Sequence, residues 1–260
     1  MHRNISRWIP RPCHKKRMDS DHADLSVIIN HTEGWNDSMN IFEILGPVMV
    51  GPSSSHTAGA VRIGYMARKI LGETPVKAQI QLHGSFAATG SGHGTDRALL
   101  AGLLGMEPDD SRIPYSRQVA HESGLAFSFE NVNLRDAHPN TAVLTVWGKE
   151  GNQVKVQASS LGGGRIMVNQ IDGIRVDFTG EKPTLIVQNE DKPGVLADIC
   201  YALYSQDVNI ATLQLYRNQK GGYAFTIAET DTDISEDVIQ ALPHMQGILK
   251  VIRIASEEEK

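Results

Sequence analysis

The chain has 260 residues, a formal net charge of -5 at pH 7 and 40% hydrophobic residues. This length suits one large domain or two ordinary ones, with enough surface to bury a real core. The absence of a broad basic field argues against nucleic-acid binding. No apolar run approaches the roughly 18 residues needed to span a bilayer. We therefore expect a soluble globular protein whose partners include neither nucleic acid nor a membrane.

Cysteine usage gives two further limits, because Cys13 and Cys200 are the only cysteines. They are too few and too far apart for a disulfide framework, which makes the cytoplasm the default location. An iron–sulfur cluster is normally held by three or four thiolates. This chain cannot supply that set, and it shows no zinc-type ligand spacing, so we expect no metal site on it.

The first 38 residues differ in character from the rest. Residues 1–18 carry basic side chains and no acid, while Pro10 and Pro12 interrupt any amphipathic helix of the kind found in targeting peptides. We interpret residues 1–38 as a disordered extension or as sequence upstream of the true start. Of the two, we favour Met39 as the first residue of the native protein.

The chain is organised around residues 51–59, which read GPSSSHTAG. An apolar run at 42–50 leads into this motif, and residues 60–71 have the apolar spacing of a helix. A serine hydroxyl at 53, 54 or 55 can cap that helix, and the remaining N–H groups favour a bound carboxylate or phosphate. His56 adds a group that moves protons near neutral pH. The motif predicts an anion-binding turn with an acid or base, the alternative being a plain capped helix.

Elements farther along the chain predict an α+β domain over residues 39–180, with a mixed sheet and few helices. Three glycines at 90, 92 and 94 indicate a flexible turn at 90–96, which brings His93, Thr95 and Asp96 together before a helix at 97–104. The alternative is that Thr95 or Asp96 only caps that helix. His138 and Asn140 form a turn. The expected strands are 76–82, 125–130, 141–147, 153–158 and an edge strand at 175–178, with a side-chain-free loop at 162–164.

The last part of the chain has a regular pattern after a linker at 180–183. Its order is strand, helix, strand, strand, helix, strand, which is the ferredoxin-like βαββαβ arrangement. We expect Asp191 to cap the first helix, with cation binding as the alternative, and Cys200 to be a core thiol. The expected ranges are 184–188, 194–206, 209–217, 223–229, 235–242 and 248–254.

Several of these motifs together resemble a known family. Residues 41–59 are similar to the start of the β chain of iron–sulfur-dependent L-serine dehydratase in its two-chain form. The similarity continues through residues 92–99, 138–141 and 162–164, and the last 70 residues resemble an ACT domain. The resemblance covers about residues 39–254. It implies a serine dehydratase β-type domain at 39–180 followed by an ACT domain at 184–255.

The resemblance also implies an activity. The family converts L-serine to pyruvate and ammonia, with a [4Fe–4S] cluster on a separate α chain that acts as the Lewis acid for the departing hydroxyl. The α chain would then be the partner of this chain. A monovalent cation and the choice between serine and threonine are left open by the sequence.

Site residues follow from the same resemblance. Ser53 and Ser55 would hold the substrate carboxylate or order the site, His56 would transfer the proton or orient the base, and Thr57 would donate a hydrogen bond. We assign substrate or interface roles to Ser54, His93, Thr95, Asp96, Asn140 and Gly163. An equally open alternative places the 53–57 turn in an allosteric serine pocket.

The ACT resemblance implies regulation and assembly. Such modules pair side by side and bind small amino-acid ligands at the turn after the first strand, here residues 189–194. We expect Asn189, Asp191 and Gly194 to contact an effector or a cation. A rival hypothesis is therefore a non-catalytic regulatory or amino-acid-sensing subunit. A nucleic-acid-binding regulator would need a helix-turn-helix and a basic face, which the sequence lacks.

Overall fold

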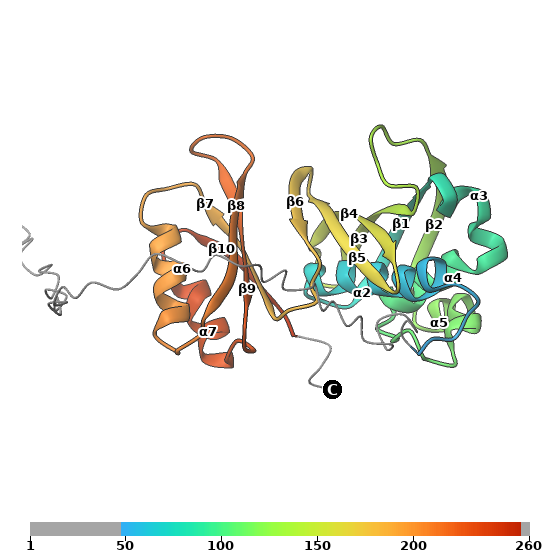
Figure 1. Cartoon of the computed structure of the whole chain (residues 1–260), viewed down its shortest axis with the longest axis horizontal. Coiled ribbons are helices and arrows are strands. Elements are labelled where there is room, and N and C mark those ends of the chain that lie inside the picture. Colours follow the sequence, from blue (N-terminus) through green and yellow to red (C-terminus); the bar gives the residue numbers. More distant parts are fainter. Residues whose placement is uncertain (1–47, 256–260) are drawn as a thin grey trace, which may run out of the picture. The chain divides into compact units, whose positions relative to one another are not determined.

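The computed structural model describes residues 48–255, which form two β-sheets with their helices (Figure 1). The predicted extension at 1–38 lies outside the described residues. Within the described part of the chain, no helix is long and apolar enough to cross a membrane. Helices combine with one mixed sheet and one antiparallel sheet, so the fold class is α+β, as the sequence predicts.

The first sheet has six strands in the order β2-β1-β3-β4-β5-β6. β1 runs parallel to β2, and the other neighbouring strands are antiparallel, which confirms the predicted mixed sheet and the edge strand at its end. One strand, β5, was not predicted. The bounds are β1 (Pro75–His83), β2 (Ala126–Val132), β3 (Thr141–Gly148), β4 (Gln153–Gly162), β5 (Arg165–Ile171) and β6 (Ile174–Phe178).

Helices pack against this sheet, led by α2 (Gly59–Leu71), which contacts β3, β4 and β5. Alternating residues of β3 explain the contact, because Ala142, Leu144 and Val146 are fully buried in the same core cluster as the apolar residues of α2. The predicted helix at 60–71 is confirmed and begins one residue earlier. A π-helical turn, η1 (Ser54–Ala58), precedes it.

The flexible turn predicted at 90–96 is wrong, because most of that stretch is helical. α3 (Gly84–His93) continues through two of the three glycines, and the chain turns only at Gly94, whose φ of 73° is left-handed. Glycine in a helix costs about 1 kcal/mol relative to alanine. Burial of Phe86, which is 0% exposed, offsets part of that loss. α4 (Thr95–Leu103) then follows, and η2 (Ile113–Tyr115) leads into α5 (Ser116–Glu122), which was not predicted.

α2 and α4 cross with their backbones in direct contact. A Cβ atom added at Gly64 would overlap the carbonyl oxygen of Leu99, and one added at Gly102 would overlap the carbonyl oxygen of Val61. Only glycine leaves room for this approach. The crossing buries leucine and isoleucine side chains of both helices in the main core. It therefore determines where α2, and the motif at its start, lies on the sheet.

The second sheet has the order β10-β7-β9-β8 and is antiparallel throughout, so the βαββαβ prediction is confirmed. Leu185, Val187 and Ala228 of this sheet share a buried cluster with Ile199 and Leu203. The bounds are β7 (Thr184–Glu190), α6 (Val195–Tyr204), β8 (Ile210–Arg217), β9 (Tyr223–Thr230), α7 (Glu236–Ala241), η3 (Leu242–His244) and β10 (Ile248–Ile254).

Two predictions within this second unit need correction. Gly194 rather than Asp191 is the N-cap residue of α6. Asp191 instead accepts hydrogen bonds from the backbone N–H of Gly221 at 2.9 Å and from Arg217 at 3.3 Å. Cys200 is half-buried rather than a core residue, and this burial raises the pKa of its thiol.

Lys250 of β10 connects the second sheet to the end of α2. Its Nζ donates to the carbonyl oxygens of Ile70 at 3.0 Å and Leu71 at 2.9 Å. These carbonyls belong to the last turn of α2, where a cation is favoured by the helix dipole. Partial burial lowers the pKa of this lysine.

The helix crossing predicts the effect of a single methyl group. We expect Gly102→Ala to lower the free energy of unfolding by about 1–3 kcal/mol, because the new Cβ has to push the two backbones apart. Gly92→Ala is the matched control, since a Cβ at exposed Gly92 in α3 meets nothing within 4 Å. The control should be neutral or stabilising by up to about 1 kcal/mol. Urea unfolding followed by circular dichroism measures both, and equal effects would contradict the close crossing.

Candidate functional site

The Ser53–Thr57 turn begins with a side-chain cap of η1, the π-helical turn that leads into α2; α2 itself has no side-chain cap. Ser53 Oγ accepts the backbone N–H of His56 at 3.1 Å, and the carbonyl oxygen of Ser53 accepts the N–H of Thr57 at 2.8 Å. Ser53 is thus the capping hydroxyl among the three candidate serines. Thr57 is 2% exposed, and its Oγ1 has no hydrogen-bond partner within the described residues. π-Helical turns of this kind occur frequently at functional sites.

His56 points its ring at the neighbouring helix α3. Its Nε2 lies 3.1 Å from Ser85 Oγ and 3.1 Å from Thr89 Oγ1. The ring centroid is 5.0 Å from that of His93 and 5.3 Å from that of Phe86. Ser85 and Thr89 share one helix face because they are four residues apart. The helix that replaces the predicted turn therefore builds a polar wall around His56.

The pKa of His56 is lowered from its ordinary value by this environment. Burial is the largest cause, since it penalises the charged ring, and the nearby His93 acts in the same direction. A hydrogen bond to the Ser85 backbone opposes the shift in part. His56 is therefore neutral at neutral pH, which is the protonation state that a general base requires.

A second wall of the site comes from the turn at His138–Asn140 and the end of β4. The Pro139 carbonyl accepts the N–H of Ser85 at 2.8 Å, and the Asn140 carbonyl accepts the N–H of Ser160 at 2.9 Å. Within the turn, His138 Nδ1 accepts the N–H of Asn140 at 3.1 Å. The turn thus holds the start of α3 beside the end of β4.

Ser160 closes the site behind η1. It is 0% exposed, and its Oγ has no hydrogen-bond partner in the part of the chain that the structure describes. A Cβ added at Gly59 would overlap this hydroxyl, so the start of α2 packs directly on β4. Buried hydroxyls without partners cost free energy unless a ligand or water satisfies them. Ser160 and Thr57 are therefore two buried hydroxyls beside His56 that no described residue satisfies.

Some predicted site residues meet here and others do not. Ser53, His56 and His93 lie together, and Ser55 Oγ lies 3.6 Å from where a Cβ at Gly162 would be, next to Gly163. Gly162 ends β4, and Gly163 and Gly164 form the tight turn into β5, at the predicted side-chain-free loop. Ser54 contributes its carbonyl oxygen, which accepts the N–H of Gly59. The functional roles of these residues stay predictions.

Thr95 and Asp96 serve other contacts. The alternative that either side chain caps α4 is wrong, because Gly94 is the N-cap residue and no side chain caps the helix. Thr95 is fully buried beside Gly90, and its hydroxyl has no partner within the described residues. Asp96 pairs with Arg117 at 2.7 Å. Asp96 therefore joins α4 to α5, and its predicted site role stays untested.

The ACT turn also places its polar side chains in internal contacts. Asn189 is 2% exposed; its Oδ1 accepts the hydroxyl of Thr226 at 2.9 Å, and its Nδ2 donates to the Glu190 carbonyl at 2.9 Å. Asp191 holds the β8–β9 turn, as described above. Gly194 has a φ of 97° and begins α6. An effector or cation role for these three residues stays a prediction.

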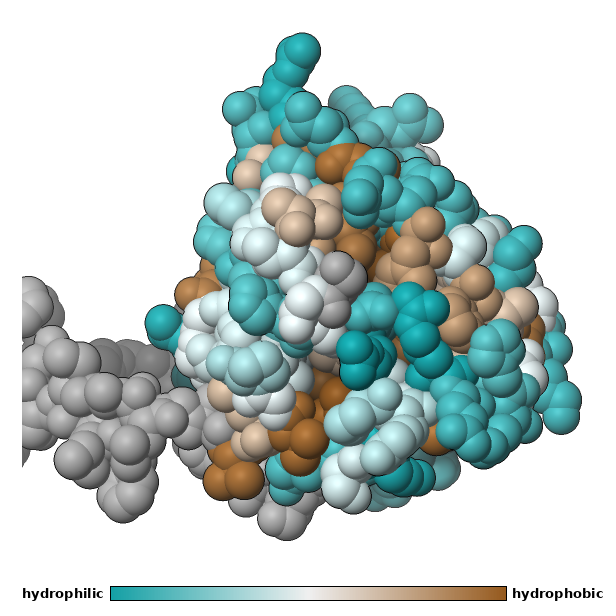
Figure 2. Space-filling view, turned by 90° about the vertical axis from the view of Figure 1, so that its right-hand side faces the viewer, coloured by the Kyte–Doolittle hydropathy of each residue, from teal (hydrophilic) through white to brown (hydrophobic). Residues whose placement is uncertain are grey.

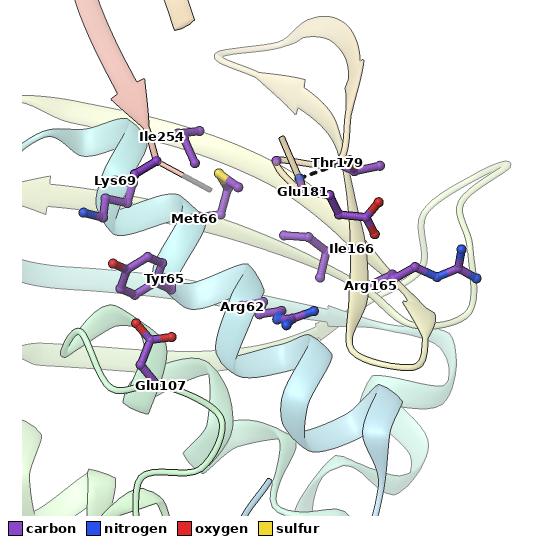
Figure 3. A pocket seen from close by; sticks show the side chains of 12 residues that line it. Arg62, Tyr65, Met66, Lys69, Glu107, Arg165, Ile166, Thr179, Glu181 and Ile254 are labelled. Carbon is purple, nitrogen blue, oxygen red and sulfur yellow. Dashed lines mark hydrogen bonds between the residues drawn. The ribbon is translucent and has the colours of Figure 1, made fainter. Parts of the chain in front are cut away.

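A separate cavity of about 70 Å³ lies along the middle of α2 (Figure 3). Tyr65 and Lys69 line it from α2, and Arg165 lines it from β5. The N–H of Glu181 donates to Thr179 Oγ1 at 3.3 Å at its rim. None of the predicted site residues lines this cavity. Across residues 48–255, no three His, Cys, Asp or Glu side chains are grouped to hold a metal ion.

Sequence reasoning missed Ser85 and Thr89, the two hydroxyl residues that contact His56. Their i, i+4 spacing is a usable signal only where a helix is expected. The glycines that follow predicted a turn instead, so the spacing of the two hydroxyl residues did not indicate a shared helix face.

The end of the first sheet on which α3 to α5 lie faces the viewer in Figure 2, where hydrophilic and hydrophobic side chains are mixed.

Comparison with known proteins adds independent information. Residues 39–123 match the family described as "Serine dehydratase beta chain", and residues 183–242 match the ACT domain. The chain is 36% identical over 216 residues to the probable L-serine dehydratase, beta chain, of Bacillus subtilis (strain 168), covering 83% of this chain and 98% of that protein. It is 40% identical over 202 residues to the L-serine dehydratase, beta chain, of Peptoniphilus asaccharolyticus, covering 77% of this chain and 91% of that protein.

The chain belongs to the serine dehydratase β-chain family. A longer relative, the L-serine dehydratase of Mycobacterium bovis, is 27% identical over 236 residues, which are 82% of this chain and 47% of that protein. The family therefore contains members of different length. The matched residues 39–123 include the 53–57 turn, Ser85, Thr89 and His93, so the His56 cluster lies within the family domain.

The environment of His56 predicts its titration. We expect its pKa, measured by NMR on the full chain, to lie below the ordinary 6.5. His93→Gln should raise it, because the electrostatic effect of the His93 ring, which lowers the pKa of His56, is removed. The unfolded chain binds protons on His56 at higher pH than the folded chain does, so this residue destabilises the fold as pH falls from about 6.5 through the folded pKa. His121→Gln, on α5, is the control and should leave the titration unchanged.

Proposed function

We propose that this chain is the β subunit of an L-serine dehydratase, an ammonia-lyase that forms pyruvate and ammonia together with a separate α chain. The supporting observation is the neutral, half-buried His56 at the start of α2, within a family domain whose relatives are named as dehydratase β chains. The 53–57 turn would reach the active site at the contact between the two chains. We further propose that the enzyme works in the cytoplasm.

The reaction divides into two tasks, removal of the α-proton and departure of the β-hydroxyl. Neutral His56 is suited to the first task as a general base. The hydroxyls of Ser53 and Ser55, at the turn that precedes α2, are suited to hold the substrate carboxylate. Thr57, whose hydroxyl has no partner within residues 48–255, would donate to the same ligand.

The second task needs a group that this chain does not hold. Two cysteines do not suffice for a [4Fe–4S] cluster, and the described residues contain no metal-ligand group of three. We therefore assign the cluster to the α chain. The longer relative, in which this chain matches 47% of the length, supports a second portion of the enzyme elsewhere.

Self-association through the ACT domain is the second part of the proposal. β8 is an edge strand of the second sheet, so one side of its backbone is free to pair with another strand. Leu213 and Leu215 of this strand are 39% and 38% exposed. Two copies joined edge to edge would extend the sheet and cover these leucines.

A regulatory or amino-acid-sensing subunit is the alternative function, and the ACT domain favours it. A small amino acid would then bind at the turn 189–194. Because Asn189 and Asp191 already use their side chains within the domain, backbone N–H and C=O groups of the turn would do most of the recognition. The activity test below separates the two functions.

The dehydratase proposal predicts activity only with the partner. Measured anaerobically, pyruvate should form from L-serine with this chain plus its co-expressed α chain, and not with either chain alone. His56→Ala in the complete complex should lower turnover by about 100-fold or more, while His121→Ala serves as the matched control. A loss below threefold for His56→Ala would remove this residue from the mechanism. An inactive complex would favour the sensing subunit.

The edge pairing predicts a concentration-dependent dimer of this chain. Sedimentation velocity of the full chain should show a dimer that Leu215→Asp dissociates, because two carboxylates would face each other across the new strand pair. Leu161→Asp, at an exposed leucine of the first sheet, is the control. A dimer that survives the β8 change, or a monomer at all concentrations, would contradict assembly through this edge.

A further inference from the structure

The hydrogen bonds around His56 have directions that follow from their partners. Thr89 Oγ1 donates its single hydrogen to the carbonyl oxygen of Ser85 at 2.9 Å, one helical turn earlier. A carbonyl oxygen is an acceptor only. The Thr89 hydroxyl therefore has only lone pairs left to offer His56 Nε2, which lies 3.1 Å away. A hydrogen on Nε2 satisfies this contact, whereas a bare Nε2 would place two lone pairs face to face.

Ser85 contributes an acceptor to the same side of the ring. Its backbone N–H donates to the Pro139 carbonyl and is therefore not available to Nε2. The Ser85 hydroxyl, 3.1 Å from Nε2, is able to accept as well.

Ser53 lies on the other side of the ring, where it can act as a hydrogen-bond donor, whereas Thr89 and Ser85 act as acceptors. Its Oγ already accepts the backbone N–H of His56 at 3.1 Å, and it lies 3.4 Å from Nδ1. Before substrate binds, its hydrogen is available for a long hydrogen bond to Nδ1; with substrate bound, the same hydrogen turns to the carboxylate and leaves the lone pair of Nδ1 open. A donor at Nδ1 and acceptors at Nε2 both favour the neutral imidazole that carries its hydrogen on Nε2.

We propose that Thr89 and Ser85 hold neutral His56 as the Nε2–H tautomer, so that Nδ1 is the atom that accepts a proton. Thr89 and Ser85 are positioning residues, since they act through His56. The tautomer itself depends only on this chain. Its use in serine breakdown rests on the proposed function.

The reaction would then place the proton at a defined atom. The Cα–H bond of serine breaks, and an N–H bond forms at Nδ1. The electron pair of the C–H bond becomes the Cα–Cβ double bond while the Cβ–O bond breaks and hydroxide leaves. The proton on Nδ1 and the hydroxide together make up the water that is lost. The imidazolium is stabilised throughout by Nε2–H donation to Thr89 and Ser85.

Nuclear magnetic resonance of the full chain labelled with ¹⁵N-histidine tests the tautomer directly, without any activity. At a pH where His56 is neutral, Nδ1 should give a pyridine-type ¹⁵N resonance and Nε2 a pyrrole-type resonance. The resonances are assigned by their loss in His56→Gln. The reverse pattern, or two averaged resonances, would overturn the proposal.

Thr89 variants test the positioning role. Thr89→Val removes the acceptor and should move the two ¹⁵N resonances toward an averaged position, while Thr89→Ser should restore the wild-type pattern. Ala88→Val places the same β-branched side chain at an exposed position of α3 and is the control for helix propensity. If Thr89→Val leaves the resonances unchanged while the helix remains folded, Thr89 does not set the tautomer.

Kinetics of the complete complex test the consequence. Thr89→Val should lower kcat by about tenfold with little change in KM, because the base is less often in its active tautomer. The acid limb of the pH–rate profile of Thr89→Val should also shift. Thr89→Ser should recover both the wild-type kcat and the wild-type pH profile. An Nε2–H tautomer in a complex without serine dehydratase activity would refute the proposed function and leave the tautomer standing. An active complex that Thr89→Val does not slow would refute the catalytic use of this tautomer.

Discussion

The close crossing of α2 and α4 is the constraint on which the candidate site depends. Gly64 and Gly102 let the two backbones touch, and the crossing seats α2 on β3, β4 and β5. The start of α2 then lies against the end of β4, where Gly59 meets Ser160. The same bundle places α3 beside η1, so the ring of His56 meets residues from a different helix. A shift of α2 by a fraction of a residue would separate these groups.

The chemistry of His56 follows from that placement rather than from the residue itself. An exposed histidine is divided between its charged and neutral forms near neutral pH. Burial and the nearby His93 lower the pKa of His56 and favour the neutral ring. Hydroxyls on both sides then orient it, and two buried hydroxyls, at Thr57 and Ser160, remain without partners within the described residues.

The two sheets contribute differently to the molecule. The first carries the His56 cluster, and the second has the ACT arrangement and an unpaired edge at β8. Lys250 of the second sheet donates to the last carbonyls of α2, the helix whose first turn carries His56. Serine dehydratase β chains of two bacteria match this chain over most of their length, so both sheets belong to the matched region.

The sequence by itself determined most local features: all strands but β5, the helix at 60–71, the capped turn before it and the βαββαβ order. Alternation and helical spacing are properties of short segments, and the 53–57 motif is contiguous. Tertiary structure decided α3, because burial of Phe86 offsets part of the low helix propensity of its glycines. It also decided that Asp191 holds a turn and Asp96 pairs with Arg117. Ser85 and Thr89 became partners of His56 only through packing between segments about 30 residues apart, which no local pattern encodes.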